Sequence, residues 1–304
     1  MSESTLLDSI PQPRFESATV AVAAPGLGSG NWSGAPSAWA TDYTVYLAYR
    51  LRRPVHEGRG HAVVVAASTD GVAFEPCVVL HKDAFGAASL ERPALVQLSD
   101  GRWRLYVSCA TPGTAHWWID AVDAARPEDF DPARRRTVLP GDEATAVKDP
   151  VVSVDGAGWM LWVCCHPLQD PHATDRMSTR FATSDDGLAW TIRPGDAIAP
   201  SPGTWFGRGA RVTSVLRLGH RWVAYFDGRA SATENAEERT GLAVGTEPGC
   251  FEPEEAGPVW ASPHGSGSLR YLSVLALRGG GYRLYFEAAT EDGGHALFTQ
   301  LVET

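Results

Sequence analysis

Short runs of aliphatic and aromatic residues alternate with polar turns along this chain, and one such run recurs at a nearly constant interval. Polar turns that precede an aromatic residue punctuate the same interval, as at 68–71 before Phe74 and at 184–187 before Trp190. The recurring runs begin at Leu47, Leu105, Leu161, Ala224 and Leu284, so consecutive runs are 58, 56, 63 and 60 residues apart. A period of this size, built from short strands and turns, is typical of the blades of a β-propeller.

The repeat also predicts how the propeller closes. The fifth unit runs out of chain after residues 295–301, before its outermost strand. An apolar segment at 15–22 begins with Phe15, which lies 59 residues, one full period, before Phe74. An N-terminal strand that pairs with the last unit would protect an edge that is otherwise open. The sequence therefore predicts an all-β, five-bladed β-propeller in one domain, 1–304, with the repeat over about 15–301 and blade five closed by the N-terminal strand.

Composition and charge limit the kinds of molecule that this protein is expected to bind. The chain has 304 residues, a formal net charge of −10, five cysteines without regular spacing, and no basic run longer than Arg134–Arg136. A nucleic-acid partner favours a basic stripe, so none is expected. Residues 1–13 do not read as a signal peptide, and no apolar run has membrane-spanning length, so we expect no membrane partner and a cytoplasmic location with reduced thiols.

Charged residues stand at the predicted entry of several central strands. In a propeller, the first strand of each blade runs along a central channel, and we place the five starts at Gly34–Ser37, Glu91–Ala94, Lys148–Val151, Ala210–Thr213 and Leu269–Leu272. A charge at such a position must be paired or face a wet cleft. Two interpretations stay open: a structural ion network of Glu91, Arg92, Lys148, Asp149 and Arg211 that plugs the channel, or a polar floor that binds a ligand.

These features resemble a known group of proteins. Five repeats, the Lys148-Asp149-Pro150 run at the start of the third, and hairpins of the form Ser-x-Asp-Gly-x-x-aromatic are similar to the five-bladed furanosidase-type glycoside hydrolases, which include the arabinanase/xylosidase and invertase/levansucrase families. The resemblance implies a sugar-binding funnel with three carboxylates, one each from blades one, three and four. It assigns to Asp149 the blade-three role of orienting the sugar and tuning the acid.

Two of the three implied carboxylates are missing from their expected places. Ala35 precedes Pro36 where the blade-one carboxylate is expected, and Arg208 and Arg211 stand where blade four should supply an acid. Glycoside cleavage ordinarily needs two carboxyl groups that flank the bond. Glu91, in the blade next to that of Asp149, can supply the second one, so the predicted catalytic residues are Asp149 and Glu91. Asp227, Glu234 and Glu287 are further acids that could enter from loops and strand ends.

The arginines point to an alternative substrate. A planar guanidinium suits bidentate capture of a carboxylate or phosphate, so Arg92 and Arg211 predict an anionic group on the ligand. Tryptophans outside the repeat pattern are candidates for an exposed stacking face, above all Trp32, which follows a glycine-rich loop. The predicted substrate-binding residues are Arg92, Lys148, Arg211, Arg208, Trp32, Trp205, His166 and Tyr271.

Three functions remain open on this sequence. The first is a glycoside-hydrolase-like enzyme that acts on a glycoside or sugar-derived small molecule in the central funnel. The second is a diverged enzyme that acts on a small anionic metabolite, and the third is a non-catalytic sugar-binding module. No cofactor is expected, and no metal is expected at Cys164-Cys165-His166, because adjacent cysteines in a strand point to opposite faces.

Overall fold

The computed structural model describes residues 10–155, 158–258 and 260–303, and the described chain is built from β-strands with a few short 3₁₀ turns. Antiparallel pairing between consecutive strands divides it into successive groups. The groups are β2 (Trp32–Ala40), β3 (Val45–Arg52), β4 (Gly60–Ser68) and β5 (Glu75–His81); β6 (Leu90–Gln97), β7 (Trp103–Ala110), β8 (Trp117–Ala124) and β9 (Arg136–Leu139); β10 (Thr145–Asp155), β11 (Gly158–Pro167), β12 (Ser178–Ser184) and β13 (Thr191–Ile192); β14 (Gly209–Leu218), β15 (Arg221–Arg229), β16 (Arg239–Glu247) and β17 (Cys250–Pro253); and β18 (Leu269–Ala276), β19 (Tyr282–Ala289) and β20 (His295–Val302).

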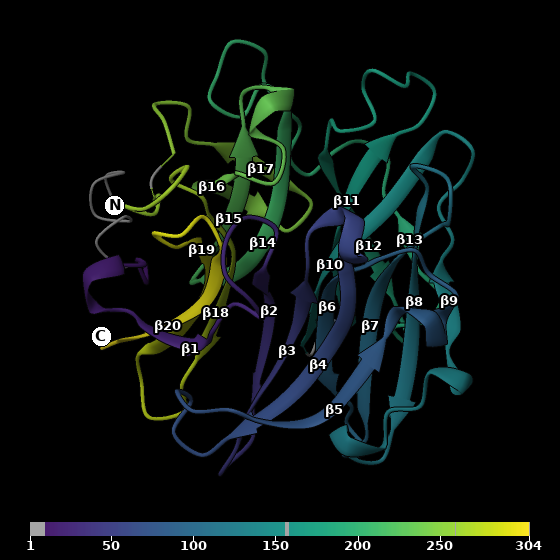
Figure 1. Cartoon of the computed structure of the whole chain (residues 1–304), viewed down its shortest axis with the longest axis vertical. Coiled ribbons are helices and arrows are strands. Elements are labelled where there is room, and N and C mark those ends of the chain that lie inside the picture. Colours follow the sequence, from purple (N-terminus) through teal and green to yellow (C-terminus); the bar gives the residue numbers. More distant parts are fainter. Residues whose placement is uncertain (1–9, 156–157, 259, 304) are drawn as a thin grey trace.

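The first strands of these groups face one another around the centre of the molecule (Figure 1). β2 contacts β6, β6 contacts β10, β10 contacts β14, β14 contacts β18, and β18 contacts β2, so the contacts form a ring. The recurring runs of the sequence fall in β3, β7, β11, β15 and β19, which are the second strands of their groups. The period therefore marks the same position in each structural repeat.

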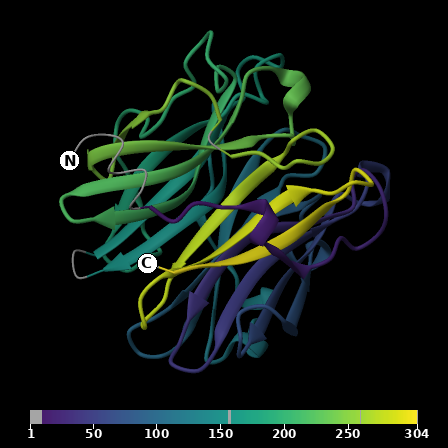
Figure 2. The ribbon, with the colours of Figure 1, turned by 90° about the vertical axis from the view of Figure 1, so that its left-hand side faces the viewer.

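The N-terminal segment pairs with the last group. β1 (Thr19–Val22) runs antiparallel to β20, with Thr19 opposite Thr299, and Figure 2 shows the N-terminal segment beside the C-terminal strands. The backbone N–H of Arg14 donates to the Gln300 side chain at 2.7 Å, and the Tyr225 hydroxyl donates to the Pro11 carbonyl at 2.7 Å. Phe15–Ser17 forms the 3₁₀ turn η1, so the strand is shorter than the predicted segment. The predicted pairing of this segment with the last unit is present; residues 1–9 lie outside the described residues.

The recurring Ser-x-Asp-Gly turns have a shared local structure. The Asp70 carboxylate accepts the backbone N–H groups of Val72 and Ala73, and Gly71 takes the positive φ of 72° that the turn requires. The carbonyl of Gly71 in turn accepts the Tyr285 hydroxyl of the last group at 2.9 Å. Each turn therefore fixes its own hairpin and also ties two neighbouring groups together.

Hydrophobic clusters fill the space between neighbouring groups. One cluster packs Val63 and Val65 of β4 against Leu105 and Val107 of β7, and a second packs Tyr225 of β15 against Leu284 of β19. Five further 3₁₀ turns lie in the connections: η2 (Val55–Glu57), η3 (Lys82–Phe85), η4 (Pro127–Asp129), η5 (Pro132–Arg134) and η6 (Ala232–Glu234). In the described part of the chain, no helix has the length and apolar character needed to cross a membrane.

Candidate functional site

Every first strand has a β-bulge at an equivalent place near its start. The pairing register shifts between Gly34 and Ser37, Leu90 and Pro93, Lys148 and Val151, Val212 and Ser214, and Arg270 and Ser273. Ala35, Asp149 and Tyr271, at the bulges of β2, β10 and β18, have φ of 53°, 54° and 55°. A bulge redirects side chains out of the regular alternation. The side chains at these bulges and beside them meet at the centre of the strand ring.

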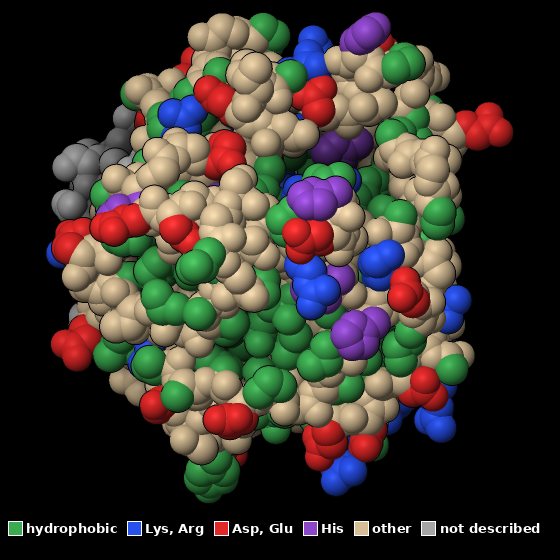
Figure 3. Space-filling view, in the orientation of Figure 1, with side chains coloured by type: hydrophobic (Ala, Val, Ile, Leu, Met, Phe, Trp, Pro, Cys, Tyr) green, Lys and Arg blue, Asp and Glu red, His purple; other side chains and the backbone are tan. Residues whose placement is uncertain are grey.

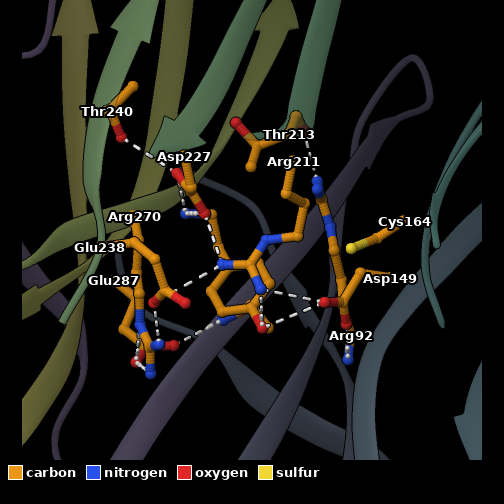
Figure 4. A network of polar contacts seen from close by, with 12 residues as sticks. Arg92, Asp149, Cys164, Arg211, Thr213, Asp227, Glu238, Thr240, Arg270 and Glu287 are labelled. Atoms are coloured by element: carbon orange, nitrogen blue, oxygen red, sulfur yellow. Dashed lines mark hydrogen bonds and ion pairs between the residues drawn. The ribbon is translucent and has the colours of Figure 1, made fainter. Parts of the chain in front are cut away.

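Arg211 holds one half of the central network (Figure 4). Its Nη1 donates to Oδ2 of Asp149 at 3.0 Å, and its Nη2 donates to Oδ2 of Asp227 at 2.7 Å. The ring of Tyr271 lies under the guanidinium, 3.8 Å from ring centroid to Cζ. Lys148 contributes a second cation to Asp149, with Nζ 3.4 Å from Oδ2. All of these groups are buried.

Arg270 and Arg50 hold the other half. Nε and Nη2 of Arg270 both donate to Oε1 of Glu287, at 3.0 and 2.7 Å, while its Nη1 donates to Glu238 at 2.6 Å. Arg50 donates to Oε2 of Glu287 at 2.8 Å and also pairs with Glu91. The result is a network in which arginines and carboxylates alternate, with contributions from first strands, second strands and the loop before β16.

Ion pairing keeps most of these carboxylates ionised. Burial pushes the pKa of Glu91 upward, but Arg50 and Lys148 outweigh it and hold that pKa well below its usual range. At Glu287, burial again raises the pKa, but Arg270 and Arg50 outweigh burial and lower it. At Asp149, Lys148 and Arg211 outweigh burial and lower the pKa in the same way. Asp227 differs, because burial outweighs Arg211 and raises its pKa to about 6. Asp227 is fully buried behind Arg211.

Two connected spaces lie beside this network. An inner cavity of about 120 Å³ is lined by seven Lys or Arg side chains and two Glu, together with His166, Tyr271, Asn235 and others. An outer pocket of about 520 Å³ shares Arg59, Lys148, His166 and Asn235 with it and adds the ring of Trp117. On the face drawn in Figure 3, Lys, Arg and His side chains gather near the centre of the view together with acidic ones.

Charge compensation around the inner cavity is uneven. Arg50, Arg211 and Arg270 are hydrogen-bonded to carboxylates. The pKa of each is raised above the usual value, because carboxylates outweigh burial at Arg50 and Arg270, and Tyr271 followed by carboxylates outweighs it at Arg211. Arg52 and Arg59 share the carboxylate of Glu91 at 3.8 and 3.9 Å, beyond hydrogen-bond distance. Burial lowers the pKa of Arg52 to about 10, the direction expected of a buried cation with too little anionic compensation.

Several predicted site residues meet here, but not all in the predicted roles. Glu91, Lys148, Arg211, Tyr271 and His166 line the inner cavity, and Asp149 lies directly behind Lys148 and Arg211. The two Nη atoms of Arg211 serve Asp149 and Asp227, so its planar group is engaged within the protein, and capture of a ligand anion by Arg211 stays a prediction. Nη2 of Arg92 likewise donates to the carbonyls of Pro36 and Thr213, at 3.2 and 2.6 Å.

The remaining predicted residues lie elsewhere. The predicted exposure of Trp32 is wrong: its indole is 4% exposed, stacks on His295 at 4.5 Å between centroids, and supports Arg52. Trp205 packs on Phe226, and its Nε1 donates to the Glu254 carbonyl. Arg208 donates to both oxygens of Asp175 and so orders the loop before β12. His166 lies near the end of β11.

Sequence reasoning missed Arg50, and it named Asp227 and Glu287 without recognising that the second strands supply polar central side chains. Arg50, Asp227 and Glu287 each stand three residues after the start of a recurring run, and Ser108 and Cys164 occupy the same position in the other two repeats. The Ser108 hydroxyl accepts the N–H of Asp149 and donates to the carbonyl of Arg92. This shared position, three residues after the start of each run, could have predicted these central side chains from the sequence. Arg52 and Arg229 share a second offset, five residues after the start of their runs, which was also an available signal. Arg59 and Glu238 lie in the connections before β4 and β16, and Trp117 begins β8, so no such offset marks them.

Within the described residues, no group of three or more His, Cys, Asp or Glu side chains is arranged to hold a metal ion. Cys164 and Cys165 are both buried, and burial raises the pKa of both thiols.

Comparison with known proteins places the fold. No family model and no curated relative match the chain. Several solved structures match the chain. One is a thermostable family-43 glycoside hydrolase, with 12% identity, 91% of each chain covered and a TM-score of 0.69. An α-L-arabinofuranosidase from Lactobacillus brevis matches with 17% identity over 88% of this chain and 90% of that one, with a TM-score of 0.67, and the GH43_1 enzyme from Xanthomonas citri complexed with xylotriose matches with 16% identity over 94% and 91%, with a TM-score of 0.65. At these identities the likeness establishes the propeller fold, and the predicted resemblance to this group is confirmed at that level.

Proposed function

We propose that this chain is a single-domain, five-bladed propeller, closed by β1, that takes a sugar-derived small molecule with an anionic group into its central pocket. The ring of contacts between β2, β6, β10, β14 and β18 and the pairing of β1 with β20 support the architecture. The fold it shares with family-43 glycoside hydrolases supports a small sugar-like ligand in the funnel. Fold alone does not fix function, so the chemistry of the pocket decides the rest.

The observation that carries the proposal is the shared carboxylate of Glu91. It faces Arg50, Arg52 and Arg59 together, and Lys148 lies on the same cavity. Arg52 is buried and Arg59 is partly exposed, and a buried cation is stable only when it is compensated. A ligand carboxylate, phosphate or sulfate between Arg52, Arg59 and Lys148 would supply the missing negative charge. The anion site proposed here therefore differs from the Arg92–Arg211 pair that the sequence suggested.

Trp117, which is 8% exposed, contributes a small apolar surface to the outer pocket. Nζ of Lys148 lies 5.0 Å from the centroid of the indole ring, and Cζ of Arg59 lies 5.6 Å from it. The same two cations also line the inner cavity, so the ring lies beside that cavity. Sugar rings present an apolar face to which a flat indole is complementary. We place the sugar ring against Trp117 and its anionic substituent toward the inner cavity.

Hydrolysis of a glycosidic bond is the second candidate, favoured by the shared fold and by Glu91 and Glu238, which both line the inner cavity. Two carboxyl groups can perform this reaction when one of them is protonated and donates to the leaving group. The pKa of Glu91 and the pKa of Glu238 are both lowered, since their arginine partners outweigh burial. This arrangement supplies two bases and no acid, so it supports anion recognition better than two-carboxylate hydrolysis.

Matched ligand pairs test the proposal by isothermal calorimetry. Glucuronate and glucose 6-phosphate should bind about ten- to a hundredfold more tightly than glucose, because a charge-assisted contact contributes roughly 1.5 to 3 kcal/mol. Arg52→Met and Arg59→Gln should each erase most of that preference. Arg102→Gln is the matched control, since Arg102 pairs with Asp100 on the surface. Equal affinity for charged and neutral partners contradicts the proposal, and turnover of neutral aryl furanosides favours the second candidate.

A further inference from the structure

His166 stands at the junction of the two spaces of the site. It is carried near the end of β11, is 9% exposed, and lines both the inner cavity and the outer pocket. Among the described residues that line these two spaces, it is the one imidazole. The carboxylates around it are held as anions by arginines, so His166 is the neutral group best placed to change its protonation state.

Its hydrogen bonds fix which nitrogen carries the proton. Nδ1 lies 3.0 Å from the carbonyl oxygen of Thr174, which can only accept, so Nδ1 carries the hydrogen. In the neutral ring, Nε2 is then the unprotonated atom. Its neighbour at 3.5 Å is Sγ of Cys164, a weak donor whose thiol stays protonated because burial raises the pKa of Cys164. Nε2 is therefore an available proton acceptor.

The charges around His166 come from several elements. Lys148 and Asp149 lie on β10, Arg229 on β15 and Asp175 in the loop before β12, and Arg176, Arg180 and Asp196 line an adjoining groove with His166. Burial, followed by Lys148 and Arg229, lowers the pKa of His166 to about 3 against the opposing pull of Asp149. Burial is the main cause that keeps the ring neutral, and the two cations that add to it both border the inner cavity.

We propose that binding of an anion in the inner cavity is coupled to uptake of one proton by Nε2 of His166, which turns this atom from an acceptor into a donor and the ring into a cation beside the anion. The inference rests on the proposed function. A bound anion offsets the positive potential of Lys148 and Arg229, which adds to burial in disfavouring imidazolium. The proton comes from solvent, and the Nδ1–H bond to Thr174 is kept.

Coupling of anion binding to proton uptake fixes the direction in which anion affinity changes with pH. A complex that holds one more proton than the free protein weakens as pH rises, by up to about tenfold in affinity per pH unit where a whole proton is taken up. Anion affinity should therefore be higher at about pH 5.5 than at about pH 8, the range in which an imidazole titrates once its cationic neighbours are compensated. A site made only of arginine and lysine would bind with constant affinity over that range.

The test is calorimetric titration of the full chain with sodium sulfate and with glucuronate, both of which keep a constant charge over this range. Each titration is run in two buffers of different ionisation enthalpy, so that the difference in heat counts the protons taken up. Wild type should take up close to one proton per anion, and His166→Gln should take up none and lose the pH dependence. His172→Gln, a change in the neighbouring exposed loop, should behave as wild type.

Spectra of histidine-labelled wild type keep the test decisive if His166→Gln fails to fold. ¹⁵N shifts should show a neutral Nδ1–H ring for His166 in the free protein and imidazolium when sulfate or glucuronate is bound. Anion binding without proton uptake overturns this inference and leaves the anion site standing. A protein that binds neither probe overturns both.

Discussion

The carboxylate of Glu287 fills the space that a side chain on Gly34 would need: a Cβ added to Gly34 would lie 2.0 Å from Oε2 of Glu287. The same oxygen accepts the backbone N–H of the next residue, Ala35, at 3.1 Å. A carboxylate from the last strand group thus stands beside the β2 bulge, where the glycoside-hydrolase resemblance expects a carboxylate on the strand itself. There it is paired with Arg50 and Arg270.

Gly34→Ala should therefore destabilise the protein strongly. The added methyl displaces the Glu287 carboxylate from two buried arginines, and breaking a buried pair costs about 3 to 5 kcal/mol. Urea denaturation measures the loss as a lower midpoint. Gly279→Ala is the matched control, because a Cβ there meets nothing within 4 Å. An unchanged midpoint for Gly34→Ala would mean that Glu287 moves freely and does not hold the arginines.

Asp149→Asn tests whether Asp149 belongs to the ion network. Asparagine tolerates the positive φ of 54° at this position, so the backbone is not disturbed. The change leaves Lys148 and Arg211 with less compensation in a buried setting, and we expect a loss of about 3 to 5 kcal/mol in the free energy of unfolding. Asp100→Asn, at an exposed surface pair, should be near neutral. Full stability of Asp149→Asn would favour a purely ligand-facing role.

The sequence predicted the fold better than the site, and the reason is physical. The period of the recurring runs reports strand packing, which every repeat needs, so the second strands at Leu47, Leu161 and Leu284 fall in register. The hydrogen-bond partners within the site depend on the strand bulges and on side-chain length, which the period does not report. Arg211 lies at the centre as predicted. Its guanidinium, which was expected to bind a ligand, is instead hydrogen-bonded to Asp227 of the neighbouring strand. Trp32 follows a glycine-rich loop but is buried against His295.

The pH dependence of stability should carry a contribution from His166. Its pKa is lowered to about 3 in the folded protein, chiefly by burial, and is about 6.5 in the unfolded chain. The unfolded state then binds more protons between these values, so this contribution is present above about pH 6.5 and is lost as pH falls toward 3. Urea titrations at stepped pH should show a shallower acid decline in His166→Gln than in wild type or His172→Gln. Identical slopes would contradict a buried neutral His166.

Asp227 should change the stability of the protein with pH in the direction opposite to that of His166. Its pKa is raised to about 6 by burial, above the unfolded value of about 3.9, so the stability it contributes is present below about pH 4 and is lost as pH rises through 6. The wild-type curve therefore sums two opposed terms between pH 4 and 6. Comparing wild type with His166→Gln at the same pH isolates the histidine, because Asp227 is common to both.

Removal of residues 1–22 should expose the outer edge of β20 and destabilise the last group. The deletion removes β1, which pairs Thr19 with Thr299 and Val20 with Phe298, and it removes buried Ile10 and the carbonyl of Pro11 that accepts the Tyr225 hydroxyl. An unpaired edge is a template for pairing with other chains, so we expect a lower melting temperature and concentration-dependent aggregation in light scattering. Val20→Ala is the matched control, because the Val20 side chain is exposed and alanine keeps the backbone pairing. A truncated chain that melts like wild type and stays monomeric would show that β1 does not close the structure.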